Sequence, residues 1–142
     1  MQTIPEVNEE LAPRLRWAIT RMARRLRQEA GTDLGPSQVA ALATIERHGP
    51  LSPSELADRE HIKRPTATRI LGHLEAAGLV ERVKDPDDGR ASILSATSEA
   101  RDLLKRLRAR KTAYLARRLG VMDAEDRRTL EKAAELLEGM LE

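Results

Sequence analysis

The sequence predicts a mostly helical protein with a small β-hairpin: a winged helix-turn-helix between N- and C-terminal helices. Two observations carry the prediction. Residues 51–97 are patterned as helix, turn, helix and two short strands joined by a tight, charged loop. The chain also has no Phe, one Trp and one Tyr, so its core must consist of Leu, Ile, Val, Met and Ala. Leu and Ala favour helices, which indicates a helical body.

Two helices are predicted before this motif. The first runs from about Pro5 to Ala30 and ends at Gly31, with an apolar face opposite a face of arginines. The apolar residues are Leu11, Leu15, Ala18, Ile19, Met22 and Leu26, and the arginines are Arg14, Arg16, Arg21, Arg24, Arg25 and Arg27. The second helix begins near Pro36, directs Val39, Leu42 and Ile45 toward the core, and stops at Gly49-Pro50.

The first helix of the motif has a clear start. Ser52 is the expected N-cap, Pro53 suits the first helical position, and Glu55 completes a capping box. Leu56 and Ala57 are expected to face the core. This box marks a helix and carries no functional information by itself.

The second helix of the motif, from Arg64 to Ala77, has one apolar stripe and one face without carboxylates. The stripe consists of Ala67, Ile70, Leu71, Leu74 and Ala77, and the opposite face carries Lys63, Arg64, Thr66, Thr68, Arg69 and His73. No acidic residue lies between Ile62 and Leu74, although 34% of the chain is charged. Such a face suits a polyanion, and the alternative is an ordinary solvated basic surface. Gly78 ends the helix.

A hairpin is predicted next. Residues 79–84 and 91–95 are strand candidates, and Asp85-Pro86-Asp87-Asp88-Gly89-Arg90 forms the loop between them. Arg90 is expected to enter a DNA minor groove, where narrow A·T tracts concentrate negative potential, with Asp85 or Asp88 pairing with it. The alternative is a plain surface hairpin whose aspartates serve only the turn.

Two helices are predicted after the hairpin. Thr97 caps the first, which has Glu99 in its first turn and runs to about Leu119. Its acidic start and basic later turns match the helix dipole, so a solvated face is favoured over a nucleic-acid or membrane surface. Asp123 caps the last helix, whose apolar stripe is Leu130, Ala133, Leu137 and Met140.

The chain resembles the MarR (multiple antibiotic resistance regulator) family of bacterial transcription regulators over nearly its whole length. The resemblance is carried by ELADREHIKRPTATRILGHLEAAGLVERVKDPDDGRA at 55–91 and by SATSEAR at 95–101. The family's wing pattern, Asp-x-x-Asp-x-Arg, falls on Asp85, Asp88 and Arg90. The chain departs from the family at Asp87, where a basic residue is common, at Lys63, where Ser is frequent, and at Ala100, where Gly is frequent.

The resemblance implies a homodimer. Residues 1–34 and 98–142 would supply dimerisation helices, and residues 35–97 would form the DNA-binding unit. A two-fold dimer places two recognition helices in successive major grooves of double-stranded DNA and requires a near-palindromic site. The alternative is a monomer whose terminal helices pack on each other.

The resemblance also assigns contacts. The residues expected to contact bases in the major groove are Lys63, Arg64, Thr66, Thr68, Arg69 and His73. Ser52 and Ser54, and less surely Ser37, are expected to bind phosphates. Arg90 is expected to enter the minor groove. A repressor released by a small aromatic or anionic effector is implied, with the pocket among the first, second and fifth helices. The side chains expected to contact this effector are Trp17, Arg21, His48 and Tyr114.

Other functional classes find little support. The chain has no Cys, which excludes a thiol-based sensor, and no catalytic constellation, cofactor motif or phosphate loop is present, so no enzyme is expected. His61 beside Asp58 and Glu60 forms at most a weak metal site, and no metal is predicted. The acidic wing and Lys63 favour one alternative function, a winged-helix module that contacts proteins and has lost DNA binding.

Charge and hydropathy set further limits. The net charge is only +2, so the distribution of charge matters more than its sum. The chain has 20 Arg and 5 Lys, a bias that a GC-rich genome explains. No apolar run reaches the length of a membrane span, and residues 1–10 are polar and acidic, so we expect a soluble cytoplasmic protein without a membrane partner.

Overall fold

The computed structural model describes residues 4–89 and 92–142 and has the predicted order of elements. Helices α1 (Ile4–Ala30), α2 (Pro36–His48), α3 (Pro53–Glu60) and α4 (Arg64–Ala76) precede strands β1 (Val80–Lys84) and β2 (Ser92–Ala96), and helices α5 (Ser98–Gly120) and α6 (Ala124–Met140) follow. The predicted fold class, mostly helical with a small hairpin, is confirmed.

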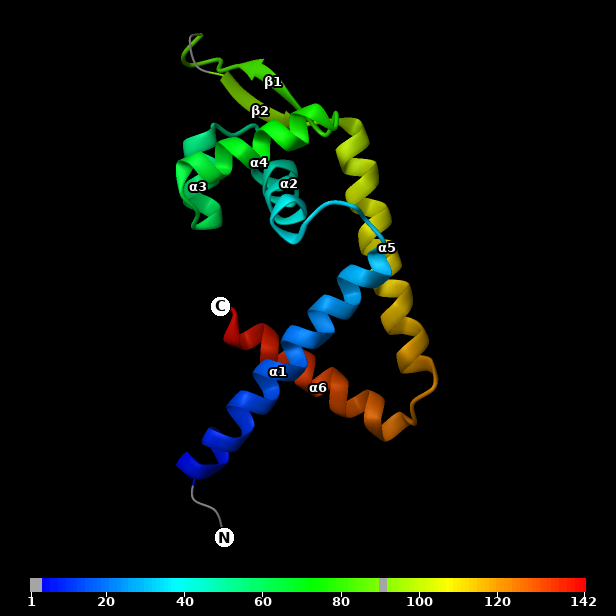
Figure 1. Ribbon diagram of the computed structural model, residues 1–142. Helices are drawn as coiled ribbons and strands as arrows, with labels where there is room; N and C mark the ends of the chain where they lie inside the picture. Colours follow the sequence, from blue (N-terminus) through cyan, green and yellow to red (C-terminus); the bar gives the residue numbers. More distant parts are fainter. Residues whose placement is uncertain (1–3, 90–91) are drawn as a thin grey trace.

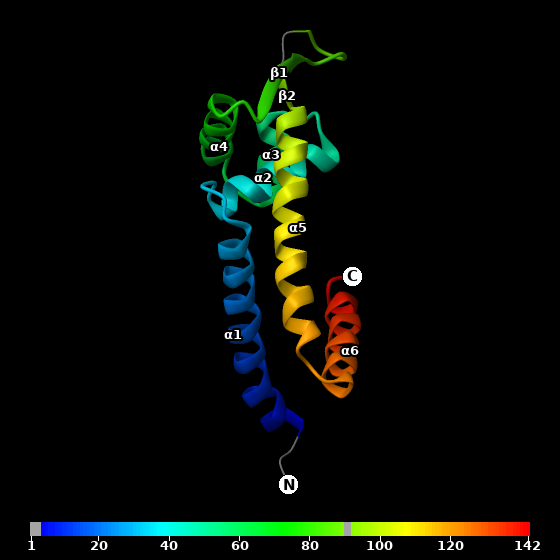
Figure 2. The ribbon, with the colours of Figure 1, turned by 90° about the vertical axis from the view of Figure 1, so that its right-hand side faces the viewer.

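The elements form a lobe on a helical stem (Figure 1). Helices α2, α3 and α4 pack together with the β1–β2 hairpin at one end of the molecule. Helices α1 and α5 pack against each other below them and run in opposite directions, so that α1 leads into the lobe and α5 leads out of it (Figure 2).

The hydrophobic core lies in the lobe. Its largest fully buried side chains are Leu42, Ile45, Leu56, Leu74 and Leu94, which come from α2, α3, α4 and β2. The apolar stripe predicted for α4 is buried at each position except its last. Predicting burial for Ala77 was wrong: α4 ends at Ala76, so Ala77 is an exposed C-cap and the chain turns away at Gly78, which has a φ of 75°.

The hairpin is anchored at its base. Strands β1 and β2 pair antiparallel, with Val80 opposite Ala96 and Lys84 opposite Ser92. Leu51 adds a short bridge to Leu94, with N···O distances of 3.0 and 2.8 Å, so the segment between α2 and α3 is tied to the sheet. Thr97 then links hairpin to stem: its hydroxyl donates to the Gly78 carbonyl and accepts from the Ala100 amide as the cap of α5.

The terminal helices leave apolar side chains in solvent. Leu11, Ile19 and Met22 of α1 are exposed, and α6 has no buried residue, with Leu136 and Met140 exposed by 60% and 72%. Helix α6 crosses α1 in Figure 1, but Figure 2 shows the two on opposite sides of α5. The terminal helices therefore do not cover each other in one copy of the chain.

Candidate DNA-binding surface

Helix α3 begins with the predicted capping box. The Ser52 hydroxyl oxygen accepts from the Glu55 amide at 3.1 Å, and the Ser52 amide donates to the Glu55 carboxylate at 3.2 Å. Because the hydroxyl acts as an acceptor here, its own hydrogen is left to donate to another group. Ser54, two residues after Ser52 in the first turn of the helix, is exposed. Both serines therefore present donors at the start of α3.

Helix α4 begins differently. Its N-cap is Lys63, whose side chain makes no capping hydrogen bond, and Pro65 occupies the first turn. The first amide donors of α4 are therefore left without a side-chain partner, beside the positive end of the helix dipole and a lysine. A helix start of this kind favours an anion.

The outer face of α4 carries exposed cations and hydroxyls. Ala67, Ile70, Leu71 and Leu74 fix the opposite face in the core, which sets the rotation of the helix. Of the predicted contact residues, Lys63, Arg64, Thr68, Arg69 and His73 are exposed and Thr66 is half-buried. All six predicted contact residues thus lie on α4 or at its N-cap. The cations Lys63, Arg64 and Arg69 lie in the first half of the helix.

Gly72 is a feature of this face that sequence reasoning missed. It lies one turn after Arg69 in α4, and a Cβ built on it would meet no atom within 4 Å. A glycine in the middle of a helix lowers its stability by about 1 kcal/mol relative to alanine. No neighbouring atom requires a glycine at this position. The missing side chain leaves a shallow place where another surface can approach the backbone.

The one carboxylate of α4, that of Glu75 in its last turn, is paired with an arginine. Arg82 of β1 donates to it with a distance of 2.9 Å between Nε and Oε2. The pair is largely exposed and contributes little stability. Its effect is electrostatic, because it neutralises the charge and joins the end of α4 to the hairpin.

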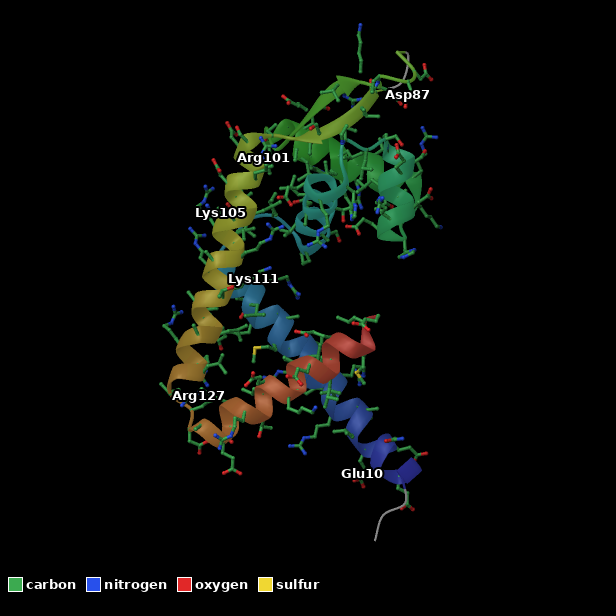
Figure 3. The ribbon with its side chains drawn as sticks, turned by 180° about the vertical axis from the view of Figure 1, so that it is seen from behind. Glu10, Asp87, Arg101, Lys105, Lys111 and Arg127 are labelled. Carbon is green, nitrogen blue, oxygen red and sulfur yellow. The ribbon has the colours of Figure 1, made fainter. Side chains whose placement is uncertain are left out.

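The wing carries acidic residues and a lysine at its base. Asp85 accepts from the Asp87 amide at 2.9 Å, which shapes the turn, and Asp87 lies at the tip of the hairpin (Figure 3). Asp88 also has an interaction partner. Arg90 lies outside the described residues, so its predicted role and its pairing with an aspartate stay predictions. Lys84, an exposed cation that ends β1, was missed, although its place just before the loop is visible in the sequence.

Ser37 belongs to α2 and lies near the helix-turn-helix formed by α3 and α4. It is exposed in the first turn of α2, and with Glu60 and Thr66 it lines a hollow of about 170 Å³ between α2, α3 and α4. One oxygen of Glu60 is buried there without a hydrogen-bond partner. The starts of α2 and α4 thus bring the hydroxyl-bearing Ser37 and Thr66 to one hollow, into which the end of α3 places the carboxylate of Glu60.

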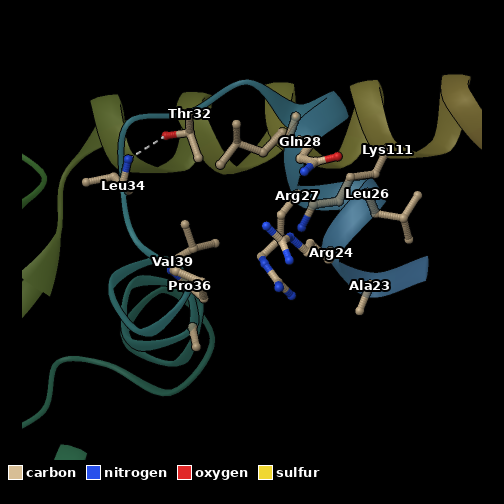
Figure 4. A pocket seen from close by; sticks show the side chains of 13 residues that line it. Ala23, Arg24, Leu26, Arg27, Gln28, Thr32, Leu34, Pro36, Val39 and Lys111 are labelled. Atoms are coloured by element: carbon tan, nitrogen blue, oxygen red, sulfur yellow. Dashed lines mark hydrogen bonds between the residues drawn. The ribbon is translucent and has the colours of Figure 1, made fainter. Parts of the chain in front are cut away.

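A larger cavity lies between the stem and the lobe (Figure 4). It has a volume of about 630 Å³, and its walls come from α1, the loop before α2, α2 itself and α5. Its polar side chains include Arg24, Arg27 and Lys111. This is the place that the sequence predicted for an effector.

The four side chains predicted for that effector do not line the cavity. Trp17 is 58% exposed further down α1, with the Arg21 guanidinium 5.7 Å from the centre of its ring. Tyr114 of α5 holds Arg25 at 5.3 Å in the same way, and His48 is exposed at the end of α2. Aromatic rings thus pair with arginines of the stem and leave the cavity to aliphatic side chains.

The described part of the chain has neither a metal site nor a membrane-spanning helix. Across residues 4–89 and 92–142, no group of three or more His, Asp or Glu side chains is placed to hold a metal ion. His61 is the C-cap of α3, with a φ of 54°. No helix in the described part of the chain is long and apolar enough to cross a membrane.

Comparison with known proteins places this surface in context. The model of the MarR family matches residues 34–92. An HTH-type transcriptional regulator of Mycobacterium bovis is 34% identical over 128 residues, which is 89% of this chain and 90% of the relative. The HTH-type transcriptional repressor MdtR of Bacillus subtilis is 32% identical over 91 residues, which is 64% of this chain and 59% of MdtR.

Solved structures share the whole fold. A transcriptional regulator protein from Pseudomonas aeruginosa superimposes with a TM-score of 0.85 at 34% identity, covering 99% of both chains. A MepR mutant of S. aureus bound to an oligodeoxyribonucleotide has a TM-score of 0.72 at 17% identity, covering 93% of this chain and 98% of MepR. The second likeness concerns the fold alone.

Proposed function

We propose, from the premise that this chain belongs to the MarR family of transcriptional regulators, that it is a homodimeric repressor of a near-palindromic DNA site. Membership in that family confirms the expectation that the chain is not an enzyme. The repressor role, the dimer and the release by an effector are proposals, and each is supported by separate features of the molecule.

The outer face of α4 is the main support for DNA binding. Arg64 and Arg69 project from it among exposed hydroxyls, and its single carboxylate is neutralised by Arg82. A helix of this kind fits a major groove, where arginine pairs with guanine through two hydrogen bonds. The uncapped start of α4 and the serines of α2 and α3 would bind phosphates on either side. MepR, which has the same fold, has been solved with bound DNA.

Dimerisation is supported by the apolar faces of α1 and α6. Both helices expose large apolar side chains to solvent, among them Leu11, Met22, Leu136 and Met140. Exposed apolar surface of this extent marks an interface. A two-fold dimer formed there would carry the two α4 helices on the same side, which accounts for a palindromic site.

Effector release is supported by the position of the cavity. Because its walls belong to both stem and lobe, a bound molecule favours one arrangement of the two. A ligand shifts an equilibrium by its difference in affinity for the two states, so a ligand that fits the arrangement unsuited to DNA releases the repressor.

Selection from a random DNA library followed by fluorescence anisotropy tests DNA binding. The full-length protein should enrich an inverted repeat and bind it with an affinity that falls about a thousandfold or more between about 50 and 200 mM salt. Enrichment of no sequence, together with weak binding that salt leaves unchanged, would contradict the proposal.

One observation favours a second function. The wing carries Asp85, Asp87 and Asp88, an acidic group that repels phosphate and suits a basic protein partner. The same salt titration separates the two: a protein-interaction module has no steep dependence of DNA binding on salt.

A further inference from the structure

We infer that the cavity between stem and lobe binds a straight-chain aliphatic carboxylate of medium length, and not an aromatic acid or phenol. The inference rests on the proposed effector-regulated function and names the chemical class of the ligand. Three features of the cavity support it: aliphatic walls, the absence of aromatic rings, and a group of cations without carboxylates.

Each element that lines the cavity contributes aliphatic side chains to its walls. Leu26 comes from α1, Leu34 from the loop before α2, Val39 from α2 and Leu107 from α5, and alanines and Pro36 fill the spaces between them. No ring is among the lining residues, because the chain has no Phe and because its Trp and Tyr lie elsewhere on the stem. An aromatic ligand would thus find no stacking partner, whereas a methylene chain contacts such walls over its whole length.

All charged side chains that line the cavity are cations. Arg24 and Arg27 of α1 and Lys111 of α5 line it, and no Asp or Glu does. Neighbouring arginines are paired, Arg25 with Glu29 at 2.9 Å and Arg108 with Glu46 at 3.4 Å. No such ion pair is found for the three lining cations within the described residues. They are therefore free to bind the head group of an anion.

The two arginines share one side of the cavity. Figure 4 shows Arg24 and Arg27 next to each other, with Lys111 on the neighbouring helix and the aliphatic Val39 and Pro36 across from them. A planar guanidinium binds a carboxylate through two parallel hydrogen bonds. The head group thus lies at α1, and the chain extends along the aliphatic walls toward α2.

The remaining polar groups do not favour a neutral ligand. The Thr32 hydroxyl oxygen already accepts from the Leu34 amide at 3.2 Å (dashed in Figure 4). Gln28 is then the uncharged polar side chain left among the lining residues. A neutral alcohol would gain nothing from the charge of the three cations, and a cationic ligand would be repelled by them.

Isothermal titration of the full-length protein with decanoate, decanol and salicylate tests the class. Decanoate should bind at least tenfold more tightly than salicylate, which has the charge without the chain, and than decanol, which has the chain without the charge. From hexanoate to decanoate, affinity should increase by up to about fourfold per methylene. Equal affinity for decanoate and salicylate, or for decanoate and decanol, overturns the inference.

Variants test the named residues. Arg27→Gln and Lys111→Gln should each weaken decanoate binding about tenfold, whereas Lys105→Gln, an exposed cation on the same helix as Lys111 but outside the cavity, should leave it unchanged (Figure 3). Ala40→Leu narrows the cavity and should weaken decanoate more than hexanoate. Equal losses in Lys105→Gln and Lys111→Gln would mean a general charge effect and overturn the assignment.

Ligand binding is measured without DNA, so this inference and the proposed function fail separately. DNA binding without decanoate binding refutes the inference alone. Decanoate binding without DNA binding refutes the proposed function alone.

Discussion

Replacing Arg69 with alanine separates recognition of a base from attraction to phosphate. The side chain is exposed on the outer face of α4 and forms no ion pair among the described residues, so its removal breaks no contact within the chain. Alanine also favours a helix. The free energy of unfolding should therefore change by less than about 0.5 kcal/mol.

The expected effect on DNA follows from geometry. A bidentate contact between arginine and guanine is worth about 1–3 kcal/mol, which corresponds to about 5- to 150-fold in affinity. The proposed dimer places one Arg69 in each half-site. If the two contacts are independent, the loss doubles to about 2–6 kcal/mol on the palindromic site. On random DNA the same change removes only a general positive charge and costs much less.

Fluorescence anisotropy with the selected site and with a scrambled duplex measures both losses at several salt concentrations. Lys105→Ala is the matched control, because Lys105 is an exposed cation on α5, outside the lobe. Equal losses on the two duplexes would refute base recognition by Arg69 and make it a phosphate contact, with a slope against salt reduced by about one unit.

Three further predictions concern the surface, the core and the stem. Gly72→Leu should leave the fold intact, since a side chain there meets open space, but should lower DNA affinity at least tenfold; unchanged affinity would mean that DNA does not approach this part of α4. Leu74→Ala should lower the free energy of unfolding by about 2–5 kcal/mol in urea denaturation, since Leu74 is fully buried. Leu136→Glu should yield monomers in sedimentation velocity, and an unchanged mass would place the dimer interface elsewhere.

Much of the fold could be predicted from the sequence because its determinants are local. Ser52, Thr97 and Asp123 each cap a helix as expected, and the oxygen of each side chain accepts from the amide three residues later. Such caps depend on three or four neighbouring residues and on nothing distant. The α4 face could be predicted for the same reason, since a helical period fixes both of its sides.

The cavity could not be predicted in the same way. Its walls come from four segments that meet only after α1 and α5 have packed together, and no local pattern records which of the many arginines face it. Trp17 and Tyr114 were predicted to contact the effector, yet each ring lies against an arginine of the stem. Gly72 was overlooked because a missing side chain leaves no periodic pattern.

Helix α5 links the cavity to the lobe that carries the DNA-binding surface. Arg108 of α5 pairs with Glu46 of α2 at 3.4 Å, and Arg110 donates to the Ala30 carbonyl at the end of α1 at 2.8 Å. The first contact ties α5 to the lobe and the second ties it to α1, and both start from residues between Leu107 and Lys111, which line the cavity.

A ligand that draws α1 and α5 together around its head group must therefore strain or shift these two contacts. In the proposed dimer, a small rotation of each lobe changes the distance between the two α4 helices, which the DNA repeat fixes at about 34–36 Å. Linkage then makes the effect reciprocal: the operator must weaken decanoate binding by the same factor by which decanoate weakens operator binding. Unequal factors, measured by titrating each in the presence of the other, would show that the two sites are not coupled through a single change of conformation.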